Sequence, residues 1–520
     1  MTISEMLARN AYMFPSDVAL IELSPDEGKR REISWREFHE RSNRIADALR
    51  KRGIRKGDKV IQLMRNSINW LEIYFGIIRT GAWVVPLNFR FTSSDIEYCV
   101  DISEAKIMIM DTEFIERVDR VKHELHTIKE YYIAGENVTA NWNSFEELVI
   151  QGSPESVPLV IRESDECGLY FTSGTTGAPK PILLTHKNME WAAIAEQAHH
   201  YQTKEDNFIL IPPLYHAGAK MHWFGSLLVG SRATLLKKVT PQIVFEAVQQ
   251  ERGTIVWLLV PWAHDILSAL DRGELKIDNY EVSCWRLMHI GAQPVPPSLV
   301  LRWRNYFPDM HYDNNYGLSE AAGPGCVHLG LQNRHKVDSI GKAGFGWQLR
   351  IVNDKGEDVT KGAIGELIVK GDGVMEEYYK NHKLTAQTIK DGWLYTGDMA
   401  KMDEEDFVYL VDRKKDVVIC GGENVYPVEV EGVLHRHPKV HDVAVIGIPD
   451  ERLGEVVAAV VDPKQGVTLT KEEVLSFCEQ QLPRYKRPRV IIFDKVPRSP
   501  TGKLEKAKLR EKYCGHPTVL

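Results

Sequence analysis

The chain has 520 residues, of which 43 % are hydrophobic and 26 % are charged. This composition is typical of a globular protein and excludes disordered, collagen-like and coiled-coil chains. There are 65 Lys and Arg against 72 Asp and Glu, and the net charge of −7 gives no sign of a nucleic-acid-binding protein.

Helices and strands alternate in the first part of the sequence. Ser34 and Glu37 form a capping box, which predicts a helix that ends near Gly53, and a second helix is expected over 68–79. Strands are expected over 59–64, 83–87, 106–110, 254–260 and 284–290. This alternation predicts an α/β fold whose strands pair in parallel.

The pattern changes at residue 349. Short strands over 349–352, 365–369 and 407–410 predict a β-rich subdomain. Beyond 412–416 we expect strands over 417–419, 440–448, 455–461 and 490–493, and helices over 427–435 and 471–481. We therefore predict a large N-terminal domain at 1–413, with two α/β layers and the β-rich subdomain, and a small mobile α+β domain at 414–520.

Cysteine usage and the N-terminal segment indicate the compartment. The seven cysteines are too few and too widely spaced for a disulfide framework or a CxxC metal pair. The N-terminus lacks a basic region followed by an apolar stretch, and no apolar run reaches the ~18 residues of a membrane span. We expect a cytoplasmic protein with reduced thiols, no signal peptide and no transmembrane segment.

A loop rich in glycine and hydroxyl residues at 170–181 is the strongest local signal. Glycines let backbone N–H groups turn toward an anion, hydroxyls donate further hydrogen bonds, and a lysine adds positive charge. The glycine spacing differs from that of a Walker A loop. In isolation such a loop is more often a surface turn. Its candidate phosphate-binding residues are Thr172, Ser173, Gly174, Thr175, Thr176, Gly177 and Lys180.

This loop resembles the phosphate-binding signature of the adenylate-forming superfamily, which includes acyl-CoA synthetases, adenylation domains and beetle luciferases. Further segments resemble the superfamily's motifs in the same order, over nearly the whole chain: 57–60, 291–294, 316–320, 395–398, 412–416, 421–427 and 500–503. The resemblance implies an AMP-forming carboxylic acid–CoA ligase. Such an enzyme uses ATP and Mg²⁺ to make an acyl adenylate, and coenzyme A then takes the acyl group.

The resemblance implies roles for residues around the nucleotide. Glu320 would bind Mg²⁺, and Lys503 would be the catalytic cation beside the attacking carboxylate. Asp398 would accept hydrogen bonds from the ribose hydroxyls, and Arg413 would contact the nucleotide. The other residues expected at ATP or AMP are Gly291, Ala292, Gln293, Asn314, Asn315, Tyr316, Gly317 and Ser319.

Two departures from the common pattern are mild. Ser319 replaces the more frequent Thr and keeps the hydroxyl, whereas Gln293 stands where a small residue is common.

The resemblance also implies that the small domain rotates between the half-reactions, with Lys415 as the hinge. The path of the thiol would then be lined by Gly421, Gly422 and Glu423. Residues 483–520 carry 11 Lys and Arg against 3 Asp and Glu, which suits an approach to phosphates.

The segment 212–222 resembles the loop on the acyl side of these enzymes. His216 follows Tyr215 where amino-acid-activating domains place an Asp, so an amino acid substrate is disfavoured. His216 is expected as a catalytic residue near the reacting carboxylate, where it would gate the carboxylate from the thiol path; a structural histidine is the alternative. Lys220 is expected to snorkel to the surface or to face solvent, with a contact to a second substrate carboxylate as the alternative. The expected pocket walls are Tyr215, His216, Trp223, Trp262, Ala292, Gly317, Leu318, Ala321, Ala322 and Gly323.

Small residues at 321–323 leave room for a fatty, alicyclic or aromatic acid. Three other functions stay open: a stand-alone adenylating enzyme that loads an acyl-carrier protein, a luciferase-like oxidative enzyme, and a catalytically dead acyl or nucleotide sensor. No carrier module is recognised after Lys503, and the retained charged residues of the site oppose the sensor. We expect small-molecule partners only, in a monomer or a homodimer.

Overall fold

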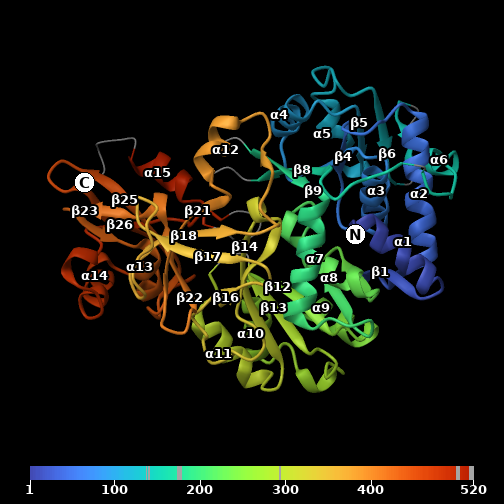
Figure 1. The fold of residues 1–520 in the computed structure, drawn as a ribbon. Helices are drawn as coiled ribbons and strands as arrows, with labels where there is room; N and C mark the ends of the chain where they lie inside the picture. Colours follow the sequence, from blue (N-terminus) through green and yellow to red (C-terminus); the bar gives the residue numbers. More distant parts are fainter. Residues whose placement is uncertain are drawn as a thin grey trace. The chain divides into compact units, whose positions relative to one another are not determined.

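The computed structural model describes residues 1–135, 138, 141–157, 159–172, 179–291, 294–498 and 504–514 (Figure 1). The chain folds as two compact units. The first contains Met1–Gln348 and Lys370–Leu394, and the second contains Leu349–Val369 and Tyr395–Leu520. The β-rich segment, which we predicted to belong to the N-terminal domain, is thus grouped with the C-terminal residues. A domain boundary at the hinge Lys415 stays a prediction.

The first unit contains two large sheets. The strands of one are β1 (Val18–Ser24), β2 (Lys29–Ser34), β10 (Asn207–Leu210), β11 (Arg232–Leu236), β12 (Ile255–Leu259), β13 (Leu287–Gly291), β14 (His311–Leu318), β15 (Gly323–His328) and β16 (Lys342–Ala343). The strands of the other are β3 (Lys59–Leu63), β4 (Trp83–Pro86), β5 (Ile107–Met110), β6 (Glu130–Ile133), β7 (Asn143–Ser144), β8 (Glu166–Thr172), β9 (Lys180–Thr185) and β19 (Glu377–Tyr378). Within the described ranges their orders are β16-β15-β14-β13-β12-β10-β11-β1-β2 and β19-β9-β8-β4-β3-β5-β6-β7.

The centres of both sheets pair in parallel, as the alternation of elements predicts. β10 pairs in parallel with β11 and β12, and β3 pairs in parallel with β4 and β5. The pairs β1–β2, β14–β15 and β8–β9 are antiparallel, so both sheets are mixed. The expectation of parallel pairing is wrong for these neighbours, because consecutive strands joined by a short turn need no crossover.

Twelve helices of the described residues belong to the first unit: α1 (Ile3–Met13), α2 (Trp35–Lys51), α3 (Ile68–Arg79), α4 (Ser93–Ser103), α5 (Ile115–Asp119), α6 (Phe145–Ile150), α7 (His186–His200), α8 (Ala217–Val229), α9 (Pro241–Glu251), α10 (Val260–Asp271), α11 (Pro297–Tyr306) and α12 (His382–Thr388). The predicted capping box starts α2, and α3 has its predicted bounds.

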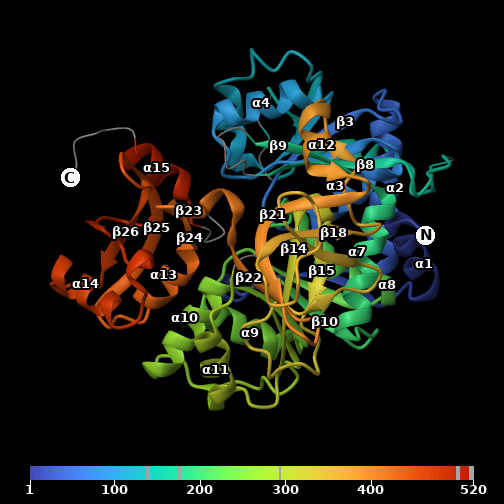
Figure 2. The same ribbon diagram turned by 60° about the vertical axis from the view of Figure 1, so that its left-hand side comes forward.

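A layer of helices joins the two large sheets. α3 contacts β3 and β4 of one sheet and β1 of the other, and α7 contacts β9 and β15 (Figure 2). One apolar core therefore includes residues from both sheets and from α2, α3, α7 and α8. The seven cysteines are all unpaired thiols, as expected.

The second unit contains β17 (Gln348–Val352), β18 (Gly365–Lys370), β21 (Trp393–Met402) and β22 (Val408–Arg413), with β18 between β17 and β21 and with β22 on β21. β20 (Ile389–Lys390) pairs with residues 393–394 within the first unit. A further sheet of the second unit has the order β24-β23-β26-β25, with β27 also on β26. Its elements are β23 (Val418–Cys420), β24 (Glu423–Val425), α13 (Pro427–Leu434), β25 (Val440–Asp450), β26 (Gly454–Pro463), α14 (Lys471–Glu479), β27 (Val490–Phe493) and α15 (Lys506–Cys514).

The predicted order of strands and helices in the C-terminal part is confirmed, with bounds that differ by a few residues. Valine and isoleucine side chains of β25 and β26 pack with α13 and α14 into a small core. No helix in the part of the chain that the structure describes is long and apolar enough to cross a membrane.

Candidate active site

The glycine-rich loop joins two antiparallel strands. β8 ends at Thr172 and β9 begins at Lys180, and these two residues are paired in the register of the hairpin. The two ends of the loop are therefore held side by side. Ser173, Gly174, Thr175, Thr176 and Gly177 lie outside the described residues, so their contact with phosphate stays a prediction.

Tyr378 links the strand after this loop to Glu320. Its hydroxyl donates a hydrogen bond to Glu320 Oε1 at 2.8 Å, and Lys180 Nζ lies 5.4 Å from the centre of its ring. Burial and the neighbouring Glu320 carboxylate raise the pKa of Tyr378, so the hydroxyl keeps its proton. The structure thus brings together two predicted residues, Lys180 and Glu320, through a third that the sequence did not indicate.

β19 holds Tyr378 in this place. It pairs with β9, where Tyr378 is opposite Ile182, and the Met375 backbone N–H donates to the Glu320 carbonyl at 2.8 Å. No local motif singles out Tyr378, because its contacts with Glu320 and Lys180 depend on a strand pairing between segments almost 200 residues apart.

The predicted adenine-side residues meet at the ends of two parallel strands. β13 ends at Gly291, and Ile290 is paired with Asn314 of β14. A Cβ at Gly291 would lie 2.7 Å from Asn315 Oδ1 and 3.2 Å from the Asn315 carbonyl oxygen, so the glycine lets Asn315 approach closely. Asn314 donates to the Ser339 carbonyl at 3.0 Å and is thereby fixed in the core. Ala292 and Gln293 lie outside the described residues.

β14 continues into the segment that carries the next motif. Tyr316 is 8 % exposed within the strand, and Gly317 and Leu318 complete it. A single 3-10 turn over Ser319–Ala321 follows and places Glu320 beside Tyr378. Ala322 and Gly323 then take positive φ angles of 57° and 97°.

The acyl-side loop runs into α8. His216 is the residue before the helix, and Asn66 holds the loop by donating to the carbonyls of Ile211 and Pro212 at 3.2 and 3.0 Å. Asn66 also accepts a hydrogen bond from the Leu214 backbone N–H at 2.8 Å. Asn66 is a second residue that sequence reasoning missed, since only the fold brings it to this loop.

Two glycines allow α8 and the start of β15 to touch. A Cβ at Gly323 would lie 2.9 Å from the Gly218 Cα, and a Cβ at Gly218 would lie 3.4 Å from His216 Nδ1 and 3.5 Å from Trp257. Ala321 and Ala322 are also buried here. The small residues predicted as pocket walls are thus packed close to the acyl-side helix.

The predicted aromatic walls lie in different surroundings. Tyr215 packs edge-on against Phe89 at 5.4 Å, and burial raises the pKa of Tyr215 to about 12. Trp262 is half-buried at the start of α10. Trp223 has no exposed surface and packs edge-on against Phe75 in the core, so a role for it in the acyl pocket stays a prediction without structural support.

Lys220 is fully buried, so the expectation of a solvent-facing lysine is wrong. Its Nζ lies 4.2 Å from the centre of the Tyr170 ring and 5.6 Å from that of Tyr74. Burial lowers the pKa of Lys220 well below its usual value. The residue spacing along α8 could not predict the burial of Lys220, because both tyrosines belong to other elements.

In the second unit, the predicted ribose and nucleotide residues are neighbours. Asp398 of β21 is paired in register with Arg413 of β22, and the Arg413 Nε lies 2.8 Å from Asp398 Oδ1. Glu366 accepts a hydrogen bond from the Gly397 backbone N–H at 3.1 Å and forms an ion pair with Lys414 at 3.0 Å. The carboxylate of Asp398 is therefore held on a well-braced hairpin.

The predicted hinge follows directly. Lys415 is exposed within a single 3-10 turn, Lys414–Asp416. Asp412 accepts a hydrogen bond from the Val428 backbone N–H at 2.8 Å, and Asp416 pairs with Arg510 at 2.7 Å. Both ends of the turn are thus anchored while Lys415 lies at the surface.

Three further predicted residues precede β24 or begin it. Gly421 and Gly422 have φ angles of 61° and 86°, and Glu423 beside them is exposed. A Cβ at Gly422 would meet nothing within 4 Å. Lys503 lies outside the described residues, just before Leu504, which forms an isolated bridge with Arg498.

Comparison with known proteins places these motifs in a family. The family described as AMP-binding enzyme matches residues 7–379, and the AMP-binding enzyme C-terminal domain matches residues 429–503. The chain belongs to the AMP-binding enzyme family. The adenylate-forming superfamily predicted from the sequence is therefore confirmed, together with its fold class.

Relatives within the AMP-binding enzyme family show the type of reaction. A feruloyl-CoA synthase of Amycolatopsis sp is 33 % identical over 92 % of this chain and 94 % of its own length. An indoleacetate–CoA ligase of Aromatoleum aromaticum is 31 % identical, with 98 % of both chains covered. The o-succinylbenzoate coenzyme A synthetase of Bacillus subtilis in complex with ATP and magnesium ion is 25 % identical, with 97 % of this chain and 99 % of that chain covered and a TM-score of 0.84. The prediction of an acid–CoA ligase that uses ATP, Mg²⁺ and coenzyme A is confirmed.

Proposed function

We propose that this acid–CoA ligase activates an aromatic carboxylic acid and that the predicted site residues carry the reaction. A substrate carboxylate oxygen attacks the α-phosphorus of ATP, the bond to the β-phosphate breaks, and pyrophosphate leaves. The thiolate of coenzyme A then attacks the acyl carbon, and AMP leaves as the acyl–oxygen bond breaks. The single observation that supports the site assignment best is the contact of Tyr378 with both Glu320 and Lys180.

Glu320 fits a magnesium ion chemically. A carboxylate is a hard oxygen donor of the kind Mg²⁺ takes, and Tyr378 fixes one of its two oxygens. A bound Mg²⁺ would neutralise phosphate charge beside Lys180. Tyr378 orients the Glu320 carboxylate and, through its ring, limits where Lys180 can lie.

Other residues orient the substrates. Asp398, held by Arg413, is suited to accept hydrogen bonds from the two ribose hydroxyls. Gly291 and Asn315 offer backbone and amide groups for the adenine edge. His216, at the start of α8, would lie beside the substrate carboxylate, and Lys503 would provide the cation for its attack.

The choice of an aromatic acid rests on similarity to named relatives. The relatives named feruloyl-CoA synthase and indoleacetate–CoA ligase are more than 30 % identical over almost the whole chain. We also propose a cytoplasmic location, which cell fractionation tests.

A panel of acids tests the substrate class. The full-length protein is given ATP, Mg²⁺ and coenzyme A with hydroxycinnamic, indoleacetic, benzoic, butyric, octanoic and lauric acids, and AMP release is measured with and without coenzyme A. The expected result is the highest kcat/KM for an aryl acid and AMP release that needs free coenzyme A. A straight-chain acid as the best substrate would overturn the aromatic class alone. AMP release only with an acyl-carrier protein would overturn coenzyme A as the acceptor.

A further inference from the structure

A group of buried histidines and carboxylates lies within the first unit, on elements that include those carrying candidate site residues. Its members come from α7, α8, β13, β14 and β15, and each side chain is at most 3 % exposed. We call it the histidine cluster, and it consists of Glu196, His200, His222, His289, Asp313 and His328. The roles assigned above to the active site use none of these side chains.

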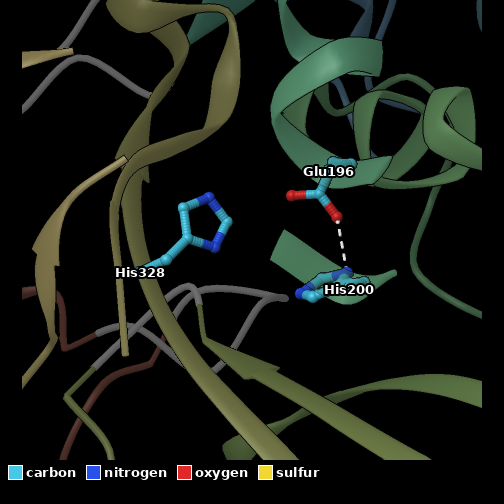
Figure 3. A group of neighbouring side chains, drawn as sticks. All are labelled: Glu196, His200 and His328. Atoms are coloured by element: carbon cyan, nitrogen blue, oxygen red, sulfur yellow. Dashed lines mark ion pairs between the residues drawn. The ribbon is translucent and has the colours of Figure 1, made fainter. Parts of the chain in front are cut away.

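Glu196 is the centre of this cluster. Its Oε2 lies 3.1 Å from His200 Nδ1, 3.1 Å from His222 Nδ1 and 3.8 Å from His289 Nδ1. Figure 3 shows the Glu196 carboxylate pointing from α7 into the space between His200 and His328. Three ring nitrogens thus converge on one carboxylate oxygen.

These contacts are close, yet they lack the alignment of hydrogen bonds. Among the described residues, neither Glu196 oxygen has a hydrogen-bond partner, and neither has the Nδ1 of His200, His222 or His289. Burial of a carboxylate is strongly unfavourable unless a cation lies beside it. Either a protonated histidine of the cluster or a metal ion held by the ring nitrogens supplies that cation.

We propose that the histidine cluster binds one divalent transition-metal ion, best matched by Zn²⁺, through Glu196, His222 and His289, whose ligand atoms lie within 4.8 Å of one another. Tetrahedral zinc with bonds of about 2.0–2.1 Å separates its ligand atoms by about 3.4 Å. The separations of His222 Nδ1 and His289 Nδ1 from Glu196 Oε2, 3.1 and 3.8 Å, lie on both sides of that value. Imidazole nitrogens with one carboxylate oxygen are a donor set that suits zinc.

Asp313 supplies the outer support that such a site requires. It accepts from His200 Nε2 at 2.8 Å and from His328 Nδ1 at 3.0 Å. These contacts fix the His200 ring beside Glu196, as outer carboxylates orient the groups around a bound metal. The Gly330 backbone N–H in turn donates to Asp313 at 3.1 Å.

The burial of the ligands assigns a structural role to the metal. Glu196, His222 and His289 are at most 3 % exposed, which leaves a substrate no access to the ion. The ion joins α7 and α8 to β13, the strand that ends at Gly291, and Asp313 extends the link to β14. It would thus fix the strands that carry the adenine-side residues against the acyl-side helix.

Metal analysis of the full-length protein tests the proposal. The protein is purified without a metal-affinity step, its zinc content is measured by elemental analysis, and it is then stripped with a chelator and titrated with Zn²⁺ while Tm is followed. The expected results are about one zinc per chain and a Tm that rises on return of the metal. A protein that holds no metal as purified, and whose Tm does not change on titration, would show a proton-sharing network instead.

Matched variants locate the ion. Glu196→Gln and His222→Gln are expected to weaken zinc binding by at least about 10-fold. The control is His186→Gln, because His186 is also fully buried on α7 with both ring nitrogens unpartnered among the described residues, yet lies outside the cluster. Equal zinc loss in all three would contradict the site. If the cluster variants do not fold, X-ray absorption at the zinc edge of the native protein decides, because nitrogen and oxygen ligands support the proposal and sulfur ligands overturn it. No step uses ATP, so failure here leaves the ligase function untouched.

Discussion

Tyr378 and Glu320 are joined by a hydrogen bond of 2.8 Å, although 57 residues lie between them in the sequence. The hydroxyl donates to the carboxylate oxygen that we propose to act beside Mg²⁺. Because Tyr378 lies on a strand that pairs with β9, the bond makes the position of Glu320 depend on the same hairpin that holds Lys180.

Tyr378→Phe tests this dependence, because it removes the hydroxyl and keeps the ring beneath Lys180. We expect the Mg²⁺ concentration for half-maximal adenylation to rise by about 10-fold, since a carboxylate that has lost its support binds metal less well. Pyrophosphate release at varied Mg²⁺ measures the effect. Tyr379→Phe, at the next residue, is the control and should leave the Mg²⁺ dependence unchanged. Equal Mg²⁺ curves for Tyr378→Phe and the native enzyme would contradict the role.

Gly323→Ala tests the close approach of α8 and β15. The added methyl group would meet the Gly218 Cα at 2.9 Å, and alanine at a φ of 97° is itself strained. We expect a loss of about 2 kcal/mol or more in the free energy of unfolding, measured by chemical denaturation. Gly57→Ala is the control, because Gly57 has a φ of 85° but open space around its Cβ position. A loss no larger than that of the control would show that the contact with Gly218 is unimportant.

Lys220→Met tests the state of the buried lysine. Its pKa is lowered in the folded protein, so as pH falls below the ordinary value the unfolded chain takes up a proton that the folded chain does not. The free energy of unfolding of the native protein therefore decreases as pH decreases. Methionine cannot take up a proton, so it removes this loss of stability. We expect the variant to gain more in Tm at pH 6.5 than at pH 9.5.

The control for this pH profile is Lys59→Met, which removes a lysine that lies 4.6 Å from the Trp83 ring. The difference in Tm between Lys59→Met and the native protein should not grow as pH falls. A Tm for Lys220→Met that is below the native value by the same amount at both pH values would show that Lys220 is charged and stabilised by its aromatic neighbours.

Arg413→Gln tests the ion pair on the hairpin of the second unit. Asp398 would keep its carboxylate but lose the guanidinium 2.8 Å away that orients it. We expect the KM for ATP to rise by roughly 10-fold, because a charge-assisted contact is lost, with a smaller effect on the KM for the acid. Steady-state kinetics with each substrate varied measure the split, and Lys401→Gln, on the strand of Asp398, is the control. Equal rises in both KM values would argue for general destabilisation.

Local signals explain what the sequence predicted well. The helix α3 has its predicted bounds because Ser67 caps its start and Gly81 follows its end. The valine-rich strands of the C-terminal part are likewise marked by residue type and by turn residues between them. The predicted adenine-side residues Gly291 and Asn315 meet, because the family's motifs are carried at the ends of neighbouring parallel strands.

Contacts between distant segments explain what the sequence did not predict. Tyr378, Asn66 and the histidine cluster acquire their neighbours from strands and helices that only the fold brings together. Lys220 was placed wrongly for the same reason, since the rings around it belong to β8 and α3. The loop residues 173–177 and Lys503 stay predictions that rest on motif alone.

The helix α3 is expected to tolerate few amino-acid substitutions at any position along its length. Eleven of its twelve residues are buried, and its charged members are all paired: Glu72 with Arg41 at 2.9 Å, and Arg79 with Asn43 and Ser4. A surface helix has one tolerant face, but here every turn contacts core on all sides. Natural variation should therefore be scarce over residues 68–79, and a tag, insertion or cleavage site placed there would be expected to unfold both sheets together.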